Sequence, residues 1–112
     1  MDCLFCAIIK GDIPSSKVYE DESCYAFRDI APQAKVHCLV VPKEHISSAD
    51  EINEENASVV AHIYKKIPEI AKMLNLTNGY RVVTNIGEDG CQSVKHLHFH
   101  ILGGTKLSEN MA

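Results

Sequence analysis

An alternation of histidine and apolar residues constrains the fold of this chain more than any other feature. Residues 96–102 read His-Leu-His-Phe-His-Ile-Leu, so half of the six histidines fall within five residues. On a β-strand, side chains two residues apart lie on one face, about 6.6 Å from each other. We therefore predict a strand over residues 94–102 that lines one surface with three imidazoles and turns Leu97, Phe99 and Ile101 toward a core. A partly exposed polar face and a three-histidine metal site are two other interpretations of this pattern.

The remaining apolar patterns predict an α+β fold. Residues 17–20 and 23–28 alternate around the acidic turn Asp21-Glu22, as in a β-hairpin, and the β-branched run 36–41 ends at Pro42, as a central strand does. Residues 80–86 predict a further strand, and residues 3–10 predict a short turn or helix. Strands and helices do not alternate regularly, so we expect a mainly antiparallel, five- to six-stranded sheet in a single domain, residues 1–112.

One long helix is predicted over residues 53–76, with Asn53 as its N-cap. Pro68 lies inside it and removes the bond to the carbonyl of Tyr64, which predicts a kink or a local break. The apolar positions that recur at helical spacing are Val60, Ile63, Ile67, Ile70, Ala71 and Leu74.

Charge and composition argue against several classes of function. The net charge is -4 over 112 residues and Lys and Arg form no dense stripe, which argues against a protein that tracks a nucleic-acid backbone. No stretch approaches the roughly 18 apolar residues of a membrane span, and no secretion signal opens the sequence, so we expect a cytoplasmic protein without membrane or nucleic-acid partners. Five cysteines, an odd number, argue against a disulfide framework and favour a metal site or free thiols.

The pattern of residues 96–102 resembles the signature of the histidine triad (HIT) family, in which three histidines alternate with apolar residues and two apolar residues follow. Residues 24–34 and 37–46 also look like segments of this family. Gln92-Ser93 before the triad and Gly103-Gly104 after it resemble the Hint-type branch, whose members cleave the P–N bond of nucleoside phosphoramidates. The resemblance implies a HIT-like fold, a purine nucleotide or nucleoside phosphoramidate as substrate, and a homodimer with one continuous sheet.

The chemistry of phosphoryl transfer accounts for the histidines. An imidazole with an ordinary pKa of about 6.5 keeps a neutral fraction at pH 7, and it attacks phosphorus when one ring nitrogen is free and an acceptor holds the other. By resemblance, His98 is the nucleophile and forms a covalent nucleotidyl-histidine that water hydrolyses. His100 hydrogen-bonds the phosphate, and His96 orients His98. Gln92 and Ser93 match positions that contact the phosphate and the leaving group, and Ser93 relays a proton to the departing amine.

The resemblance also implies a nucleoside pocket. It puts Asp29 on the ribose hydroxyls with Ile30 beside it, and Asn85 near the phosphate. The resemblance also makes His37 a partner of the triad histidines that does not contact the substrate itself. Taken singly, these residues and the apolar residues of the pocket have simpler interpretations. Asn85 could be a strand-end Asn that satisfies backbone groups, His37 a satisfied buried histidine, and the apolar residues ordinary core. The base is expected among Leu4, Phe5, Ile8 and Phe27.

Cys3 and Cys6 form a Cys-x-x-Cys pair that needs two more ligands to hold structural zinc. The sequence offers His45 and His96, and some HIT relatives carry zinc on two cysteines and two such histidines. Reduced free thiols are one alternative. A thioredoxin-like redox pair is another, although its βαβ context is missing.

Departures from the Hint-type pattern leave other functions open. Cys91 replaces a usual glycine, Lys95 replaces a common aromatic residue, and residues 106–112 lack the Trp-Pro-Pro ending of eukaryotic members. The alternatives are a dinucleoside polyphosphate hydrolase and a zinc-stabilised nucleotide-binding module with little catalysis.

A homodimer is also expected from the unprotected edge run 80–86 and from a wide apolar stripe on the long helix, Ile63, Tyr64, Ile67, Ile70 and Met73.

Overall fold

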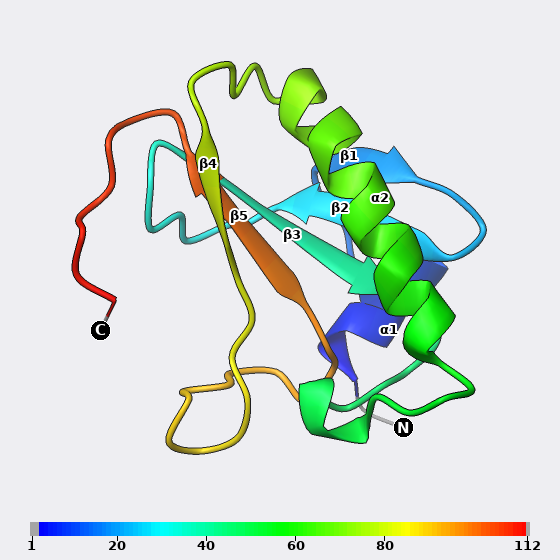
Figure 1. Ribbon diagram of the computed structural model, residues 1–112. Helices are drawn as coiled ribbons and strands as arrows, with labels where there is room; N and C mark the ends of the chain where they lie inside the picture. The colour runs from blue at the N-terminus through cyan, green and yellow to red at the C-terminus, as the bar shows by residue number, and fades with distance from the viewer. Residues whose placement is uncertain (1–2, 112) are drawn as a thin grey trace.

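The structure is a computed structural model that describes residues 3–111, and within them an antiparallel five-stranded sheet carries two α-helices (Figure 1). The strands follow the order β1-β2-β3-β5-β4, and every neighbouring pair is antiparallel. The α+β prediction is confirmed. The elements are α1 (Leu4–Lys10), β1 (Lys17–Glu20), β2 (Cys24–Arg28), β3 (Val36–Pro42), the 3-10 turn η1 (Ala49–Glu51), α2 (Ala57–Met73), β4 (Tyr80–Val83) and β5 (Phe99–Gly103).

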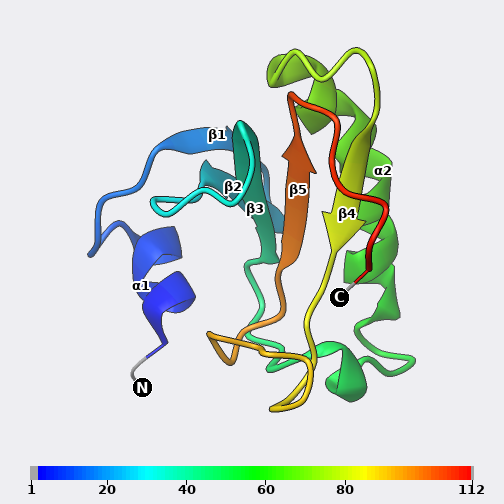
Figure 2. The same ribbon diagram turned by 90° about the vertical axis from the view of Figure 1, so that its left-hand side faces the viewer.

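The two helices lie on opposite faces of the sheet, with α2 across one face and α1 on the other (Figure 2). Strand β3 explains this arrangement, because it is apolar on both sides. Cys38 and Val40 belong to the core under α2, whereas Leu39 and Val41 belong to the core under α1. A continuous apolar run is expected of a central strand that is buried on both faces.

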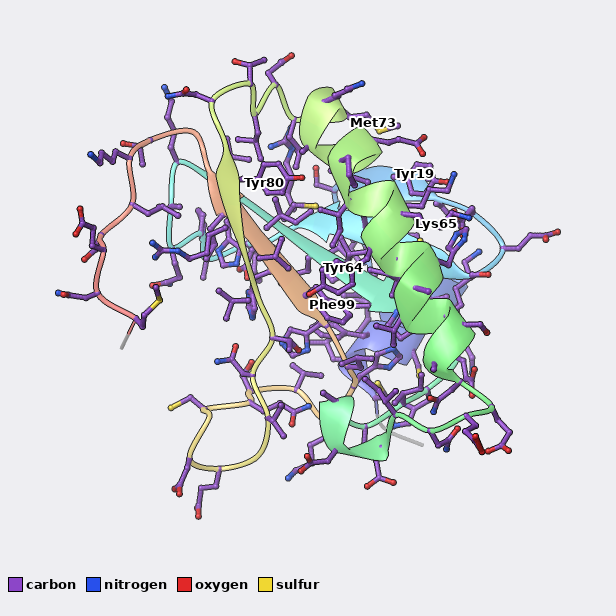
Figure 3. All side chains as sticks on the ribbon, in the orientation of Figure 1. Tyr19, Tyr64, Lys65, Met73, Tyr80 and Phe99 are labelled. Carbon is purple, nitrogen blue, oxygen red and sulfur yellow. The ribbon has the colours of Figure 1, made fainter. Side chains whose placement is uncertain are left out.

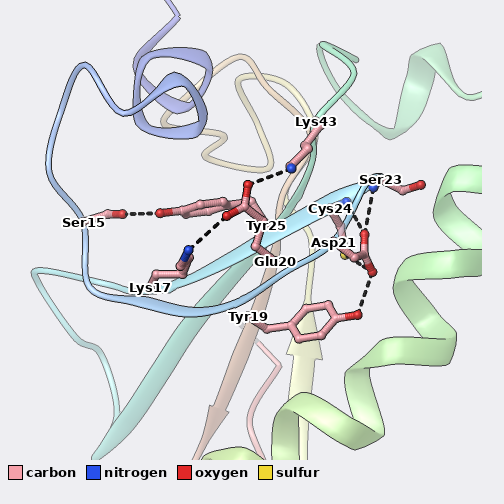
Figure 4. Close-up of polar contacts among 9 residues, drawn as sticks. All are labelled: Ser15, Lys17, Tyr19, Glu20, Asp21, Ser23, Cys24, Tyr25 and Lys43. Atoms are coloured by element: carbon pink, nitrogen blue, oxygen red, sulfur yellow. Dashed lines mark hydrogen bonds and ion pairs between the residues drawn. The ribbon is translucent and has the colours of Figure 1, made fainter.

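The acidic turn between β1 and β2 forms as predicted. The Asp21 carboxylate accepts hydrogen bonds from the backbone N–H groups of Ser23 and Cys24, at 2.8 and 2.9 Å, and so closes the hairpin (Figure 4). Helix α1 ends at Lys10 and is capped by Gly11, whose φ of 86° lets its N–H reach back to the carbonyls of Ala7 and Ile8. The predicted end of this short element is confirmed.

The long helix is shorter than the sequence predicts, and the break at Pro68 is not formed. Asn53 accepts hydrogen bonds from the N–H groups of Glu55 and Asn56, so its side chain holds the turn before the helix instead of capping it. Asn56 is the N-cap, and α2 then runs without interruption to Met73. Burial of its apolar face against the sheet outweighs the one bond lost at the proline.

The strand predicted over residues 94–102 is corrected: β5 starts only at Phe99, so His96 and His98 precede it and His100 alone of the triad lies in the sheet. The ladder ends where Val40 of β3 faces Phe99. Beyond that point, the N–H of Leu97 bonds to the carbonyl of Ile46 instead of to β3. The apolar half of the prediction is confirmed, because Leu97, Phe99 and Ile101 all pack in the core under α2.

Strand β4 also ends earlier than predicted, at Val83 rather than at residue 86. The hydroxyl of Thr84 donates to the carbonyl of His98 at 2.8 Å, so a side chain takes the place of the next ladder bond. Among the described helices, none is long and apolar enough to cross a membrane.

Candidate active site

A backbone carbonyl determines which ring nitrogen of His98 carries the proton. His98 Nδ1 lies 2.7 Å from the carbonyl oxygen of His96, and because a carbonyl only accepts, Nδ1 carries the proton. The Nε2 atom of the neutral ring is then left with a lone pair, and it has no hydrogen-bond partner in residues 3–111. No buried side-chain nitrogen or oxygen in this range lacks a partner, so Nε2 keeps contact with solvent although the residue is only 2% exposed.

A chain of hydrogen bonds determines the tautomer of His100 in the same way. The N–H of Gln33 donates to His37 Nδ1 at 3.0 Å, so His37 carries its proton on Nε2. That atom lies 2.8 Å from His100 Nδ1 and donates to it, which leaves the proton of His100 on Nε2. Burial lowers the pKa of His37, and burial together with the neighbouring His98 and His37 lowers the pKa of His100 to about 4. Both rings are therefore neutral at pH 7.

Asp29 lies beside this chain at the end of β2. Its Oδ2 atom is 3.5 Å from His37 Nε2, and its Oδ1 atom accepts a bond from the N–H of Ala31 at 2.8 Å. The structure therefore brings together three residues that the sequence analysis assigned to the ribose, the support of the triad and the phosphate: Asp29, His37 and His100.

The apolar residues assigned to the base divide into a packed wall and an exposed rim. Phe5, Ile8 and Phe27 are buried together in the core under α1. The ring of Phe5 meets His98 edge to face, with centroids 5.1 Å apart, so the wall touches the candidate nucleophile directly. Leu4 is 45% exposed and Ile30 is 99% exposed, so these two side chains lie free at the surface.

The cysteines and histidines assigned to zinc converge on one point. Cys3 Sγ and Cys6 Sγ lie 3.3 and 3.6 Å from His96 Nδ1, and Cys6 Sγ lies 3.4 Å from His45 Nδ1. The two histidine Nδ1 atoms are 3.1 Å apart. Zinc–ligand bonds of about 2.3 Å to sulfur and about 2.0 Å to nitrogen put neighbouring corners of a tetrahedron roughly 3.3–3.8 Å apart, so the donor set fits this ion.

The second ring nitrogen of His96 supports the same assignment. His96 Nε2 donates to the carbonyl oxygen of Pro42 at 2.8 Å, which leaves the lone pair on Nδ1, the atom that faces the cysteines. Burial lowers the pKa of His96, so the ring is held in its neutral, ligating form. A backbone carbonyl is one of the common outer partners of a ligating histidine in metal sites. All four residues are close to a geometry that holds a metal ion.

Comparison with known proteins identifies the family of this chain over nearly its whole length. A family model described as scavenger mRNA decapping enzyme C-term binding matches residues 2–111. An uncharacterized HIT-like protein from Synechococcus elongatus is 47% identical over 107 residues, which cover 96% of this chain and 94% of the relative. The chain belongs to the histidine triad (HIT) family.

Solved structures of HIT proteins share the fold at high identity. A HIT family hydrolase from Clostridium thermocellum is 45% identical with a TM-score of 0.96, and the alignment covers 99% of this chain and 97% of that one. A histidine triad protein from Clostridium difficile is 50% identical with a TM-score of 0.94, and the alignment covers 98% and 96% of the two chains.

In this HIT protein, two of the polar residues assigned to the phosphate form hydrogen bonds from their side chains to backbone groups. The amide nitrogen of Gln92 donates to the carbonyls of Ser47 and Val94, and its oxygen accepts from the N–H of Gly87. Asn85 donates to the carbonyl of Gly90 at 2.7 Å. Both side chains thus hold the loop 85–94 in shape. Ser93 is exposed on that loop, and its hydroxyl has no hydrogen-bond partner within residues 3–111.

Sequence reasoning missed the backbone groups that control this HIT site. The carbonyls of His96 and Pro42 and the N–H of Gln33 set the tautomers of three histidines. Every residue carries such groups, so no residue type signals them. The carbonyl that His98 Nδ1 reaches is two residues earlier in the chain, and any residue there would supply it.

Proposed function

We propose that this chain is a nucleotidyl hydrolase that cleaves the P–N bond of purine nucleoside 5'-phosphoramidates through a covalent intermediate on His98. One observation carries the proposal: Nδ1 of His98 is held by the carbonyl of His96, which leaves the Nε2 lone pair available for attack. That tautomer is the one a histidine nucleophile needs. The similarity to HIT proteins described as hydrolases supports the reaction class.

The proposed reaction has two displacements at phosphorus. His98 Nε2 forms a bond to phosphorus while the bond to the amine breaks, and the hydroxyl of Ser93 gives its proton to the departing amine. Water then attacks phosphorus and the bond to Nε2 breaks, while a proton of the water returns to Ser93. The products are the nucleoside 5'-monophosphate and free His98. His100 presents its Nε2–H to a phosphate oxygen, a donor position that the hydrogen bond from His37 maintains. A donor fixed before the substrate arrives stabilises developing charge without reorganisation.

The nucleoside part of the substrate is assigned to the face of the sheet under α1. Asp29 accepts hydrogen bonds from the ribose hydroxyls, and Phe5, Ile8 and Phe27 form the apolar wall for the base. Leu4 and Ile30, exposed in the protein alone, become covered when the base and ribose bind. With the nucleoside bound in this way, the reacting phosphorus would lie next to His98, the residue that Phe5 contacts.

Zinc is proposed as a structural cofactor on Cys3, Cys6, His45 and His96. Four protein donors satisfy its tetrahedral preference and leave no position for a substrate atom or water, so the ion supplies stability and no step of catalysis.

A homodimer is proposed from the apolar side chains that remain on α2 and β4. Tyr64 and Met73 are each 51% exposed, and Tyr80 is 38% exposed. Figure 3 labels these residues on the two neighbouring elements. Strand β4 is at the edge of the sheet, so pairing across a two-fold axis would cover both the edge and the helix.

The decisive experiment traps the intermediate. Wild type is mixed with adenosine 5'-phosphoramidate, diadenosine polyphosphate or AMP, quenched in acid, digested and analysed by mass spectrometry. We expect an added nucleotidyl group on the peptide that holds His98, and fast turnover of the phosphoramidate alone. His98→Ala should lose turnover and retain AMP binding, whereas the matched control His62→Gln, a histidine on α2 outside the site, should keep both. An adduct on any other residue refutes the assignment.

A further inference from the structure

Helix α1 depends on other parts of the chain for its position. It has seven residues, and isolated helices below about 12–15 residues are marginal in water. It also lies apart from α2, on the other face of the sheet (Figure 2). Its attachment within residues 3–111 is of two kinds, the apolar packing of Phe5 and Ile8 and the polar contacts of Cys3 and Cys6.

The two cysteines attach one end of α1 to two separate segments. Cys3 Sγ lies 3.3 Å from Nδ1 of His96, which precedes β5, and Cys6 Sγ lies 3.4 Å from Nδ1 of His45, which follows β3. Cys3 is also the N-cap of α1, because its sulfur accepts the N–H of Cys6. An ion bound by these four residues would therefore join the start of the helix to both segments.

Phe5 lies between the two cysteines in sequence and makes the contacts that matter for the substrate. Its ring meets His98 at 5.1 Å and Phe27 at 5.5 Å between centroids, both edge to face. If the start of α1 moves, Phe5 leaves His98 and the wall for the base opens. The position of the nucleoside wall thus depends on the cysteine contacts.

The nucleophile itself is anchored without α1. His98 Nδ1 bonds to the carbonyl of His96, and His96 Nε2 bonds to the carbonyl of Pro42. Leu97 between them is fixed by its N–H bond to Ile46. None of these bonds involves a residue of α1, so they persist when the helix separates from the sheet.

We propose that Cys3 and Cys6 are positioning residues for the nucleoside: by holding a metal ion with His45 and His96, they dock α1 and thereby set the affinity of the substrate site. This inference rests on the proposed function. Loss of the ion undocks α1, raises KM and weakens nucleotide binding, while the attack of His98 on phosphorus changes much less. Metal supply would then regulate the enzyme through its affinity for substrate.

The test compares zinc-loaded wild type, wild type treated with a chelator, the chelated protein after ZnCl2 is added back, and the Cys3→Ser, Cys6→Ser variant. Hydrogen exchange of the peptide covering residues 4–10 reports on α1 without any nucleotide. Metal removal should accelerate this exchange about tenfold or more, as expected of a segment that opens locally. Zinc should restore protection in wild type but not in the variant. Cys91→Ser, which changes an exposed cysteine, is the control and should match wild type in metal content and protection.

Kinetics on the same samples completes the test. With adenosine 5'-phosphoramidate, metal loss should raise KM about tenfold and change kcat less than about threefold, the pattern of lost ground-state binding. Unchanged exchange over residues 4–10, or a fall in kcat at constant KM, overturns the inference. If zinc-loaded wild type neither binds AMP nor turns over any nucleotide, the proposed function fails, and the exchange data still decide whether the ion docks α1.

Discussion

Asp21 connects the β1–β2 turn to helix α2, and its removal should destabilise the protein in a pH-dependent way. Besides the backbone bonds from Ser23 and Cys24, its carboxylate accepts hydrogen bonds from Tyr19 at 2.8 Å (Figure 4) and from His62 Nε2 at 2.7 Å. His62 is on α2, so this pair joins the helix to the hairpin. Asp21→Asn removes the charge and turns one acceptor oxygen into a donor.

The pKa of Asp21 gives the sign of the effect. Burial raises this pKa, but the donors, His62 first and then Ser23, Tyr19 and Cys24, outweigh burial and hold the pKa well below its usual range. A carboxyl whose pKa is lowered on folding contributes stability above its unfolded pKa of about 3.9, and the contribution is lost as pH falls through the lower folded value. The destabilisation by Asp21→Asn should therefore be largest near neutral pH.

The size of the effect follows from the lost hydrogen bonds. Bonds to a charged group contribute about 1.5–3 kcal/mol each when buried. The Asp21 side chain is 22% exposed, and asparagine keeps one acceptor oxygen. The free energy lost is therefore well below that of four full hydrogen bonds. We expect a loss of about 2 kcal/mol in the free energy of unfolding at pH 7.

Urea unfolding followed by circular dichroism measures the loss at about pH 7 and about pH 3. The difference between wild type and Asp21→Asn should shrink by about 1 kcal/mol at the lower pH, because the unfolded carboxyl is then mostly protonated. Glu22→Gln, the same change at the exposed neighbouring position, is the control and should stay within about 0.5 kcal/mol of wild type. An equal loss at both pH values, or a loss below about 0.5 kcal/mol at pH 7, refutes the reasoning.

Three further predictions concern the tautomer chain, the core and the dimer. His37→Phe removes the donor to His100 and should lower kcat about tenfold or more with little change in KM; a change confined to KM contradicts the proton assignment. Ile63→Ala opens a cavity at a fully buried position on α2 and should cost about 2–5 kcal/mol in urea unfolding, and a loss under about 1 kcal/mol is inconsistent with the packing. Light scattering should give about twice the chain mass of 12.4 kDa for wild type and for Lys65→Asp, and the single mass for Tyr64→Asp; a monomeric wild type ends the dimer proposal.

Those parts of the fold that depend on burial alone were predictable from the sequence. The run 36–41 was identified as a central strand because burial on both faces makes every position apolar, and α2 was found because one face of it is buried. The ends of elements depended on single hydrogen bonds. Asn53 has the right chemistry for an N-cap, yet its oxygen is used one turn earlier, and no pattern in the sequence distinguishes the two outcomes.

The sequence predicted the cluster of cysteines and histidines more accurately than it predicted the backbone of the histidine triad. Spacing and resemblance together named Cys3, Cys6, His45 and His96, and the structure brings these four into one cluster. The three imidazoles do line one surface, as predicted, because Phe5 meets His96 and His98 and the ring of His98 meets that of His100. The predicted strand is wrong at His96 and His98, because pairing with β3 stops at Phe99. A strand pattern indicates which faces alternate, whereas the point at which pairing ends depends on the partner strand.

The hydrogen bonds of His96 support an indirect role for this residue in the proposed reaction. Its Nδ1 atom faces the cysteines and its Nε2 atom donates to Pro42, so among the described residues both ring nitrogens are engaged and neither is left for a substrate. Its carbonyl, in contrast, holds the proton of His98. A single residue thus connects the cluster of Cys3, Cys6 and His45, the end of β3 and the candidate nucleophile. Substitution of its side chain should act first on the cysteine–histidine cluster and on α1, and should reach His98 through Phe5 as well as through the backbone.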